Sequence, residues 1–191
     1  ITLIPQYTGP CTITMNGKSL VTGILTLNDS TTTAPAGCSF NFVDAFSSNA
    51  AVTITSCGAV NINSTFTCGG IFTLTLGTLN FGSSTHNLFS FISNSSSTRT
   101  INFGTCSINL TGNAATIWST SVITGLTISG TVPVLNCTYA GATGTRTIAP
   151  GLLSEAQALS FNFLSGSDTI TEAAATYSYK NLQNFPYYLH Q

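Results

Sequence analysis

Residues 71–76 read Ile-Phe-Thr-Leu-Thr-Leu, an alternation of apolar and hydroxyl-bearing side chains with a period of two. Successive side chains of a β-strand point to opposite faces, so this pattern is typical of a strand with one buried and one polar face. Threonine, isoleucine and phenylalanine also suit a pleated, half-buried surface. The stretch therefore predicts a β-strand.

The same alternation recurs along much of the chain, in residues 52–55, 101–103, 108–110 and 126–129. Glycines separate these runs at short intervals, and the pattern predicts roughly a dozen short strands in the first three quarters of the chain. We therefore expect an all-β fold with almost no helix. A β-solenoid is the favoured architecture, and one or two β-sandwich domains of jelly-roll or immunoglobulin-like type are the alternative.

The pattern divides the chain into three parts. Residues 1–9 are expected to form an extended N-terminal arm, in which Pro5 disfavours a central strand position. Residues 10–150 form a β-rich body, and residues 151–191 form a β-rich C-terminal part with a tyrosine-rich tail. Because Ile1 cannot be a translational start, we expect a processed form or a fragment whose export signal has been removed.

Two kinds of short repeat bear on the architecture. Thr98-Arg99-Thr100-Ile101 returns as Thr145-Arg146-Thr147-Ile148, which fits stacked units of a solenoid, and chance recurrence in a threonine-rich chain is the alternative. Thr-x-Thr pairs also recur, and on a regular solenoid they could form a flat hydroxyl array like that of ice-binding proteins. They start at residues 12, 53, 65, 73, 98 and 145. Spacings of 41, 12, 8, 25 and 47 residues follow no fixed period, so we expect ordinary outward strand positions.

The chain has few charged residues and many hydroxyl-bearing ones. Charged residues make up 5% of it, against about 25% in an ordinary globular domain, whereas 33 residues are threonine and 23 are serine. Nucleic-acid binding needs a basic stripe, and four basic residues at a net charge of −1 exclude it. No apolar run approaches the roughly 20 residues of a membrane-spanning helix, so we expect no membrane span.

So little charge cannot keep the protein dispersed by mutual repulsion. Its surface must instead be kept soluble by hydroxyl groups or attached glycans, or be covered by assembly into a polymer. These options fit an extracellular location, at the surface of a cell or of a virion.

Several stretches resemble known repetitive proteins. They are Ser-Ser-Ser-Thr-Arg-Thr-Ile-Asn-Phe-Gly at 95–104, Cys-Ser-Ile-Asn-Leu-Thr-Gly at 106–112, Ile-Trp at 117–118, Gly-Thr-Arg-Thr-Ile at 144–148 and Tyr-Lys-Asn-Leu at 179–182. Together, over residues 70–182, they resemble Thr/Ser/Gly-rich tail- or adhesin-like β-proteins of uncultured bacteriophages and environmental bacteria. The resemblance implies an elongated β-solenoid, or a related all-β body, in a fibre or surface appendage. It carries over no catalytic residues.

The cysteines leave two interpretations open. Six are present, namely Cys11, Cys38, Cys57, Cys68, Cys106 and Cys137, which suits three disulfides in an exported protein. Five of the six share the parity of neighbouring apolar residues, where a free cysteine acts as a small hydrophobe. Inward-facing cysteines can also pair across a core, and the sequence gives no connectivity. With only His86 and His190 and no close Cys/His cluster, we predict no metal site and no cofactor.

N-glycosylation sequons begin at five asparagines: Asn28, Asn63, Asn94, Asn109 and Asn136. Chance alone predicts about five in a chain this rich in serine and threonine, so the number is uninformative. A glycan on any of them would nevertheless solubilise a charge-poor surface.

Catalytic chemistry has little support in the sequence. The carboxylates are Asp29, Asp44, Glu155, Asp168 and Glu172. A glycosidase needs two carboxylates at a fixed separation, and Asp168 and Glu172, four residues apart in an expected loop, are no such signal. The sequence contains no Gly-x-Ser-x-Gly elbow and no phosphate-binding loop. We predict that the protein is not an enzyme.

The two termini carry candidate assembly residues. In the arm, Leu3, Pro5 and Tyr7 alternate with their neighbours, and such a segment can add to the sheet edge of another copy. The alternative is an edge strand of its own domain or a fraying terminus. In the tail, Phe185, Tyr187 and Tyr188 could form a second contact, because aromatic residues are enriched at interfaces.

These observations predict a structural subunit of an extracellular fibre, either a viral tail appendage or a cell-surface filament. Copies of the chain would join head to tail into a helical or linear homopolymer. The alternative is a glycan-binding adhesin module with surface glycans as partners. Exposed aromatics beside polar side chains would favour the adhesin, and the exposure of Trp118 is left open.

Overall fold

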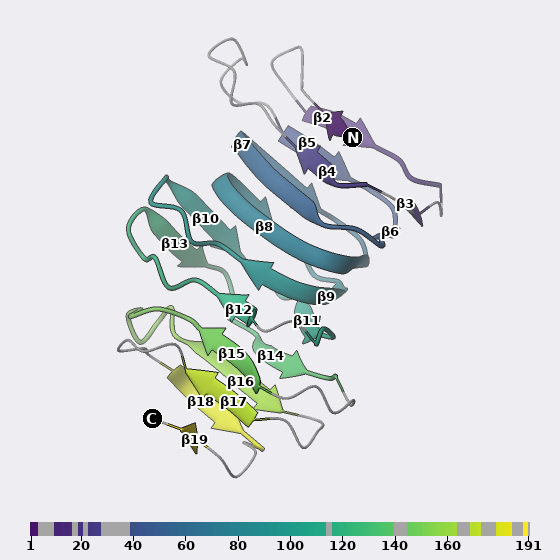
Figure 1. Ribbon diagram of the computed structural model, residues 1–191. Helices are drawn as coiled ribbons and strands as arrows, with labels where there is room; N and C mark the ends of the chain where they lie inside the picture. Colours follow the sequence, from purple (N-terminus) through teal and green to yellow (C-terminus); the bar gives the residue numbers. More distant parts are fainter. Residues whose placement is uncertain are drawn as a thin grey trace.

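The computed structural model describes residues 1–3, 10–16, 19–20, 23–27, 39–113, 116–139, 145–163, 169–172, 179–184 and 189–190. Within these residues there are nineteen β-strands and no helix. All pairings between these strands are parallel. The coils stack along one axis from the N-terminal to the C-terminal end (Figure 1). The all-β prediction is confirmed, and the architecture is the solenoid rather than the sandwich.

The chain passes through three sheet faces in turn, which we call face 1, face 2 and face 3. Face 1 contains β1 (Thr2–Leu3), β4 (Leu25–Leu27), the start of β7 (Val52–Ile62), the middle of β8 (Phe66–Asn80), the end of β9 (Thr85–Ile92), β12 (Thr116–Ser119), β15 (Thr145–Ala149), β17 (Thr169–Glu172) and β19 (Leu189–His190). Face 2 contains β2 (Pro10–Ile13), β5 (Ser39–Phe42), the ends of β7 and β8, β10 (Arg99–Asn102) and β13 (Leu126–Ser129). Face 3 contains β3 (Ser19–Leu20), β6 (Phe46–Ser48), the starts of β8 and β9, β11 (Ser107–Leu110), β14 (Val134–Cys137), β16 (Leu159–Phe163) and β18 (Tyr179–Gln183).

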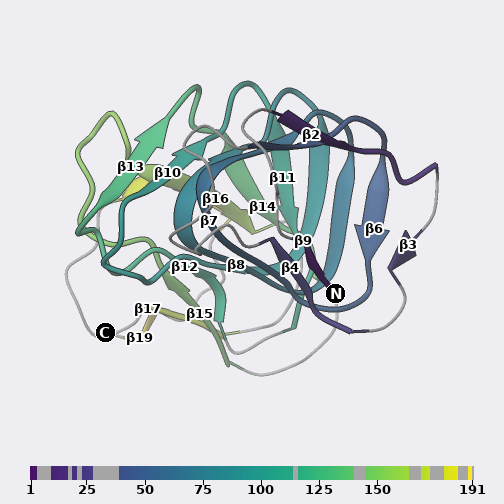
Figure 2. The ribbon, with the colours of Figure 1, turned by 90° about the horizontal axis from the view of Figure 1, so that it is seen from above.

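The coils differ in length, although their strands stay paired, with local register shifts in four pairings. On face 1, Phe72 pairs with Phe91, 19 residues further on, whereas Trp118 pairs with Ile148, 30 residues further on. Seen from above, the coils overlie one another and the strands curve around a shared interior (Figure 2). The extra residues of the longer coils therefore lie in the connections between faces, and this explains why the sequence shows alternation without a fixed repeat.

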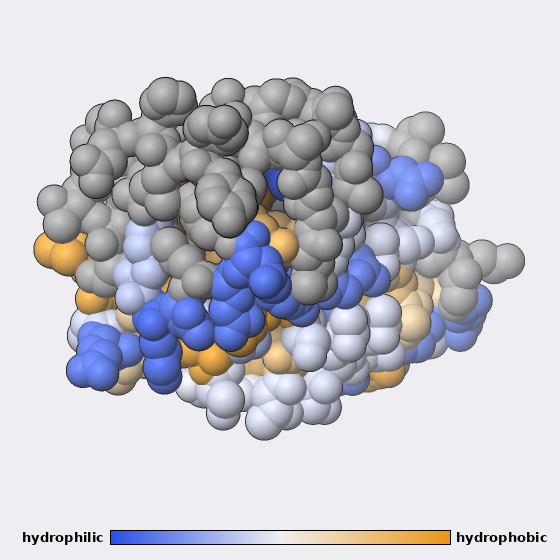
Figure 3. Space-filling view, turned by 90° about the horizontal axis from the view of Figure 1, so that it is seen from below, coloured by the Kyte–Doolittle hydropathy of each residue, from blue (hydrophilic) through white to orange (hydrophobic). Residues whose placement is uncertain are grey.

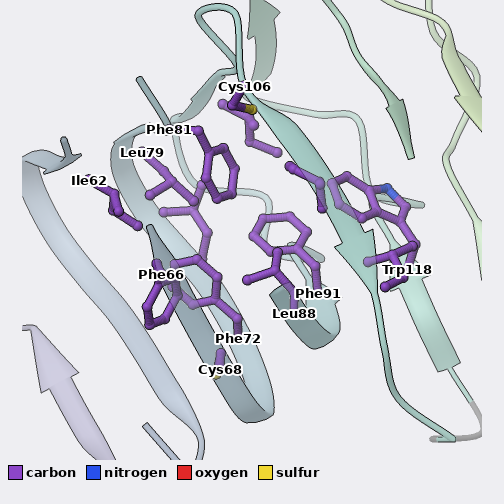
Figure 4. Packing of buried hydrophobic residues seen from close by; sticks show 14 of the residues in the cluster. Ile62, Phe66, Cys68, Phe72, Leu79, Phe81, Leu88, Phe91, Cys106 and Trp118 are labelled. Carbon is purple, nitrogen blue, oxygen red and sulfur yellow. The ribbon is translucent and has the colours of Figure 1, made fainter. Parts of the chain in front are cut away.

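The interior is filled by side chains that pack against one another both within a coil and between successive coils. Aromatic rings make a nearly continuous column, with centroid separations of 4.4 Å between Phe46 and Phe66, 5.2 Å between Phe66 and Phe72, and 5.6 Å between Phe72 and Phe91. Trp118 stacks on Phe91 at 4.6 Å (Figure 4). Burying each such side chain contributes about 1.5–3 kcal/mol, so this column supplies much of the stability of the fold.

Among the described residues, face 2 has fewer strands than the other two faces. Its last described strand is β13, and the next passage of the chain, residues 150–158, contains a turn but no strand. The Gln157 side-chain amide donates a hydrogen bond of 3.3 Å to the backbone oxygen of Ile128 in β13. This side chain thus replaces a backbone donor of the missing strand.

The two Thr-Arg-Thr-Ile strings are not equivalent units of the solenoid. Arg99 lies in β10 on face 2, whereas Arg146 lies in β15 on face 1, so the expectation that the strings stack is wrong. Both arginines are buried, Arg99 at 0% and Arg146 at 1% exposure. The Arg146 guanidinium lies over the Tyr139 ring, 5.8 Å from its centroid.

Arg99 joins two successive coils through hydrogen bonds of its guanidinium. Its Nε donates to the Ser93 hydroxyl at 2.9 Å, and its Nη1 and Nη2 donate to backbone oxygens. Those oxygens belong to Ser97 at 3.1 Å, Thr124 at 3.3 Å and Val122 at 2.5 Å. Burial lowers the pKa of Arg99, and these oxygens offset part of the cost of burying its charge.

The Thr-x-Thr pairs lie on different faces. Thr53 and Thr73 are paired on face 1, Thr67 lies on face 3, and Thr100 lies on face 2. All four are partly exposed and alternate with buried apolar neighbours. They are outward positions on ordinary strands, and their irregular spacing reflects their division among three faces.

One corner between face 2 and face 3 depends on glycine. Gly82, Gly104 and Gly130 have φ values of +69°, +58° and +78° and occupy this corner in three successive coils. The Gly82 oxygen accepts from the Thr105 nitrogen at 2.9 Å, and the Gly104 oxygen accepts from the Thr131 nitrogen at 2.9 Å. A Cβ atom on Gly104 would clash with the Gly82 carbonyl oxygen, so a side chain there would push the coils apart.

Gly104→Ala is therefore expected to destabilise the protein more than Gly23→Ala. Gly23 also has a positive φ, +87°, but a Cβ there would meet no atom within 4 Å. The control thus carries only the left-handed backbone penalty of about 1–2 kcal/mol, which corresponds to a fall in Tm of a few degrees in a chain of this size. Thermal unfolding followed by circular dichroism should show a fall at least roughly twice as large for Gly104→Ala. Equal falls would contradict the close stacking of this corner.

Candidate functional site

Face 3 carries an outward row of polar side chains, which we call the face-3 row. Its members are in register and follow one another as Ser19, Ser47, Thr67, Asn87, Asn109, Asn136 and Asn162. Asn184 extends it by one more rung through a hydrogen bond to Asn162. The row therefore runs along face 3 from β3 to Asn184, which lies one residue beyond β18, whereas the register partner of Asn162 within β18 is Gln183.

Every hydrogen bond within the face-3 row has the same direction. Each Nδ2 donates to the preceding rung: Asn87 to Thr67 at 3.5 Å, Asn109 to Asn87 at 2.9 Å, Asn136 to Asn109 at 3.4 Å, Asn162 to Asn136 at 3.3 Å and Asn184 to Asn162 at 2.8 Å. The Ser47 hydroxyl likewise donates to Ser19 at 2.6 Å. Amide ladders of this kind stabilise stacked parallel strands, and here all donors point toward the N-terminal end.

A second row, the face-2 row, lies across the glycine corner. It runs through Thr12, Asn41, Asn61, Asn80, Asn102 and Ser129, all in register. Asn61 donates to Asn41 at 2.5 Å and Asn80 donates to Asn61 at 2.6 Å, again toward the N-terminal end. The Asn102 oxygen instead accepts from the Gly104 nitrogen at 3.0 Å and so holds the corner. Two neighbouring faces thus present ordered, uncharged amide and hydroxyl groups.

The described strands at each end of the solenoid have only one sheet neighbour. β1, β2 and β3 pair only with β4, β5 and β6, and at the other end β18 and β19 pair only with β16 and β17. Within the described residues, the backbone groups on their other side have no ladder partner and point along the axis. At the C-terminal end, hydrophilic residues form a band with hydrophobic residues exposed beside it (Figure 3). The unpaired edges of the terminal strands at both ends can pair with a further strand.

The predicted assembly residues are only partly described. Leu3 lies in β1, where it pairs with Leu27 of β4 and packs against the core of its own chain. This part of the arm is thus the first rung of the solenoid. The other candidates lie outside the described residues: Pro5, Tyr7, Phe185, Tyr187 and Tyr188.

The described cysteines are free thiols. Cys11 is exposed on β2, whereas Cys68, Cys106 and Cys137 are buried in the core. Burial raises the pKa of Cys68 to about 11 and the pKa values of Cys106 and Cys137 to about 12. These three act as small apolar residues that stay protonated at neutral pH. Cys38 and the side chain of Cys57 lie outside the described part of the chain.

The sequon asparagines differ in their surroundings. Asn109 and Asn136 belong to the face-3 row, so their amide nitrogens are hydrogen-bonded. The Asn94 nitrogen donates to the Ser119 hydroxyl at 2.8 Å. Asn63 is exposed at the corner after β7. Asn28 lies outside the described residues.

The described carboxylates, Asp44 and Glu155, and the buried His86 lie apart from one another in the fold. The Asp44 carboxylate accepts from the backbone nitrogens of Met15 at 2.8 Å and Asn16 at 2.5 Å, and Glu155 is exposed in the turn of the 150–158 passage. His86 is fully buried, with its Nε2 2.7 Å from the Phe81 oxygen, and burial lowers its pKa. Nothing is described of Asp29, Asp168 or the side chains of Glu172 and His190. In the described residues, no group of three His, Cys, Asp or Glu side chains could hold a metal ion.

No helix in the described part of the chain is long and apolar enough to cross a membrane. No family model, curated protein or solved structure matches the chain. Inferences about function therefore depend on the geometry described above.

Neither amide row was predicted from the sequence, although a signal for both is present. Asparagine lies between two apolar residues in the strings Phe-Asn-Phe at 40–42, Val-Asn-Ile at 60–62, Leu-Asn-Phe at 79–81, Ile-Asn-Phe at 101–103 and Ile-Asn-Leu at 108–110. In two coils the face-2 and face-3 asparagines are seven residues apart, Asn80 with Asn87 and Asn102 with Asn109. The sequence signal for the rows is thus an asparagine between two apolar residues, followed about seven residues later, on the next face, by a second asparagine of the same kind.

We expect Asn109→Ala to destabilise the protein, because Asn109 both donates to Asn87 and accepts from Asn136. Loss of the two bonds should lower the free energy of unfolding by about 1–3 kcal/mol. Ser107→Ala is the matched control, since Ser107 is exposed on the same strand and should change stability by less than about 0.5 kcal/mol. Urea denaturation measures both values. The row would have no stabilising role if the two variants unfolded at the same urea concentration.

Proposed function

We propose that this chain is a structural subunit of an extracellular fibre, in which copies stack end to end along the solenoid axis. The observation that carries the proposal is the set of parallel ladders on faces 1 and 3, which continue along the described solenoid, with local register shifts, to edge strands at both ends. A second copy stacked on either end would continue the ladders and pair their edge strands.

The direction of the face-3 row supports head-to-tail stacking. At the C-terminal end, Asn184 donates inward to Asn162, so its amide oxygen faces outward as an acceptor. At the N-terminal end, Ser19 accepts from Ser47, so its hydroxyl hydrogen is available for donation outward. Copies in the same orientation bring this donor to that acceptor, whereas inverted copies bring like groups together. Such a heterologous contact propagates into an open polymer.

The surface supports a location outside the cell. The face-2 and face-3 rows expose hydroxyl and amide groups rather than charges. Both buried arginines are removed from the surface, which leaves it even poorer in charge than the sequence indicates. Ordered hydroxyl and amide groups hydrate a rod without the repulsion that would oppose its polymerisation.

The glycan-binding alternative gains no support from the tryptophan. Trp118, whose exposure the sequence left open, is 0% exposed and packs on Phe91, and its indole nitrogen donates to the Thr120 hydroxyl at 3.2 Å. It therefore offers no ring for a sugar to stack on. We propose the fibre in preference to the adhesin.

Negative-stain electron microscopy at several protein concentrations tests the fibre, and a cysteine pair tests its polarity. Filaments with an axial repeat of one protomer are expected, and monomers at every concentration would contradict the proposal.

Ser19→Cys combined with Asn184→Cys, with Cys11, Cys38 and Cys57 replaced by serine, should give covalent multimers on oxidation. Neighbouring rungs lie about 4.7–4.9 Å apart, within the Cα separations of disulfides. Ser107→Cys with Asn184→Cys is the control and should give none.

A further inference from the structure

Among the described sequons, one asparagine differs from the others in the freedom of its amide. Asn63 follows β7 at the corner between face 2 and face 3 and is exposed, as is Thr65, which completes the Asn-Ser-Thr sequon. The backbone nitrogen of Asn63 is bonded to the Phe42 oxygen at 2.9 Å, which fixes the main chain. Its side-chain amide makes no hydrogen bond within the described structure, so its nitrogen is open to solvent.

The other described sequons lack this freedom. In the face-3 row, the amide nitrogens of Asn109 and Asn136 each donate to the preceding rung, and polar side chains lie on both sides at the strand spacing of about 4.7–4.9 Å. Asn94 donates to the Ser119 hydroxyl at 2.8 Å and accepts from the Ser121 nitrogen at 3.0 Å. A sugar on any of these three amides would displace a bond or a neighbouring side chain.

The coil that follows leaves room beside Asn63. The neighbouring corner position is Gly82, where a Cβ would lie 2.9 Å from the Ile62 oxygen and 3.9 Å from the Cα of Asn63. In the coils that follow, Gly82, Gly104 and Gly130 place no side chain at this corner position, and the exposed residues directly after them, Ser83, Thr105 and Thr131, are small and uncharged. A bulky group on Asn63 can lie over this corner without meeting a large or charged side chain from it.

We propose that Asn63 carries an N-linked oligosaccharide. The donor class is a polyprenyl-diphosphate-linked oligosaccharide: the Asn63 Nδ2 forms a bond to the anomeric carbon of the first sugar, the bond from that carbon to the diphosphate breaks, and the amide loses one proton. The inference rests on the proposed extracellular location, because this donor acts on exported chains. A glycan at this corner solubilises the charge-poor rod and hinders side-by-side packing, while it leaves the two ends free.

The test is to secrete the 191-residue chain from a eukaryotic host in an Asn28→Gln background and to map its glycopeptides by mass spectrometry. An intact mass above that of the polypeptide, removed by peptide-N-glycosidase and assigned to Asn63, is the expected result. Asn63→Gln and, separately, Thr65→Ala should each abolish the increment, and the second variant keeps Asn63 itself. Asn109→Gln should leave the increment unchanged.

A folded, secreted chain with an unmodified Asn63 would overturn the inference, as would occupancy of Asn94, Asn109 or Asn136. The fibre is judged separately. Unglycosylated protein that still forms filaments overturns only the glycan, whereas glycosylated protein that stays monomeric at every concentration, before and after enzymatic deglycosylation, overturns only the fibre.

Discussion

In-register parallel pairing between coils is the constraint on which the rest of this structure depends. A slip of one residue would turn every inward side chain outward, so the packed rings of Phe46, Phe66, Phe72 and Phe91 hold the register as well as the core. The chain keeps this register although the distance along the sequence varies from 19 residues, between Phe72 and Phe91, to 30, between Trp118 and Ile148. The strand pairing is thus the same from one coil to the next, whereas the number of residues per coil varies.

The same constraint accounts for the unusual composition. In a parallel ladder, each outward side chain has its counterparts directly above and below, about 4.7–4.9 Å away. Like charges at that distance repel, whereas asparagine, serine and threonine can donate to one rung and accept from the next. A solenoid that fills these positions with amides and hydroxyls needs few charges, and 5% is what the chain has. The resulting rows also have a direction, which a rod assembled from identical units can propagate.

Alternation such as that of residues 71–76 is sufficient to predict the strands, because it depends only on which side chains face the core, whereas it favours the solenoid without excluding the sandwich. Features that depend on which residues become neighbours across coils were not predicted. Arg99 and Arg146 share a local string yet lie on different faces, and the amide rows are separated by variable intervals in the sequence. Trp118 has the same parity as Thr116, so the sequence does not decide its exposure. In the structure the register shifts between Thr116 and Trp118, and Ile117 and Trp118 are both buried. Parity assigned Cys68, Cys106 and Cys137 correctly to the apolar side but also included Cys11, which is exposed on β2, a strand with one neighbour.

X-ray fibre diffraction from aligned filaments tests the central claim most directly, because it measures the direction in which the rungs repeat. Coils stacked end to end place the strands across the filament axis. The account therefore predicts a meridional reflection at about 4.7–4.9 Å, parallel to that axis. An equatorial reflection at this spacing, or its absence from well-aligned filaments, would contradict a fibre built by continuing the solenoid from one copy to the next.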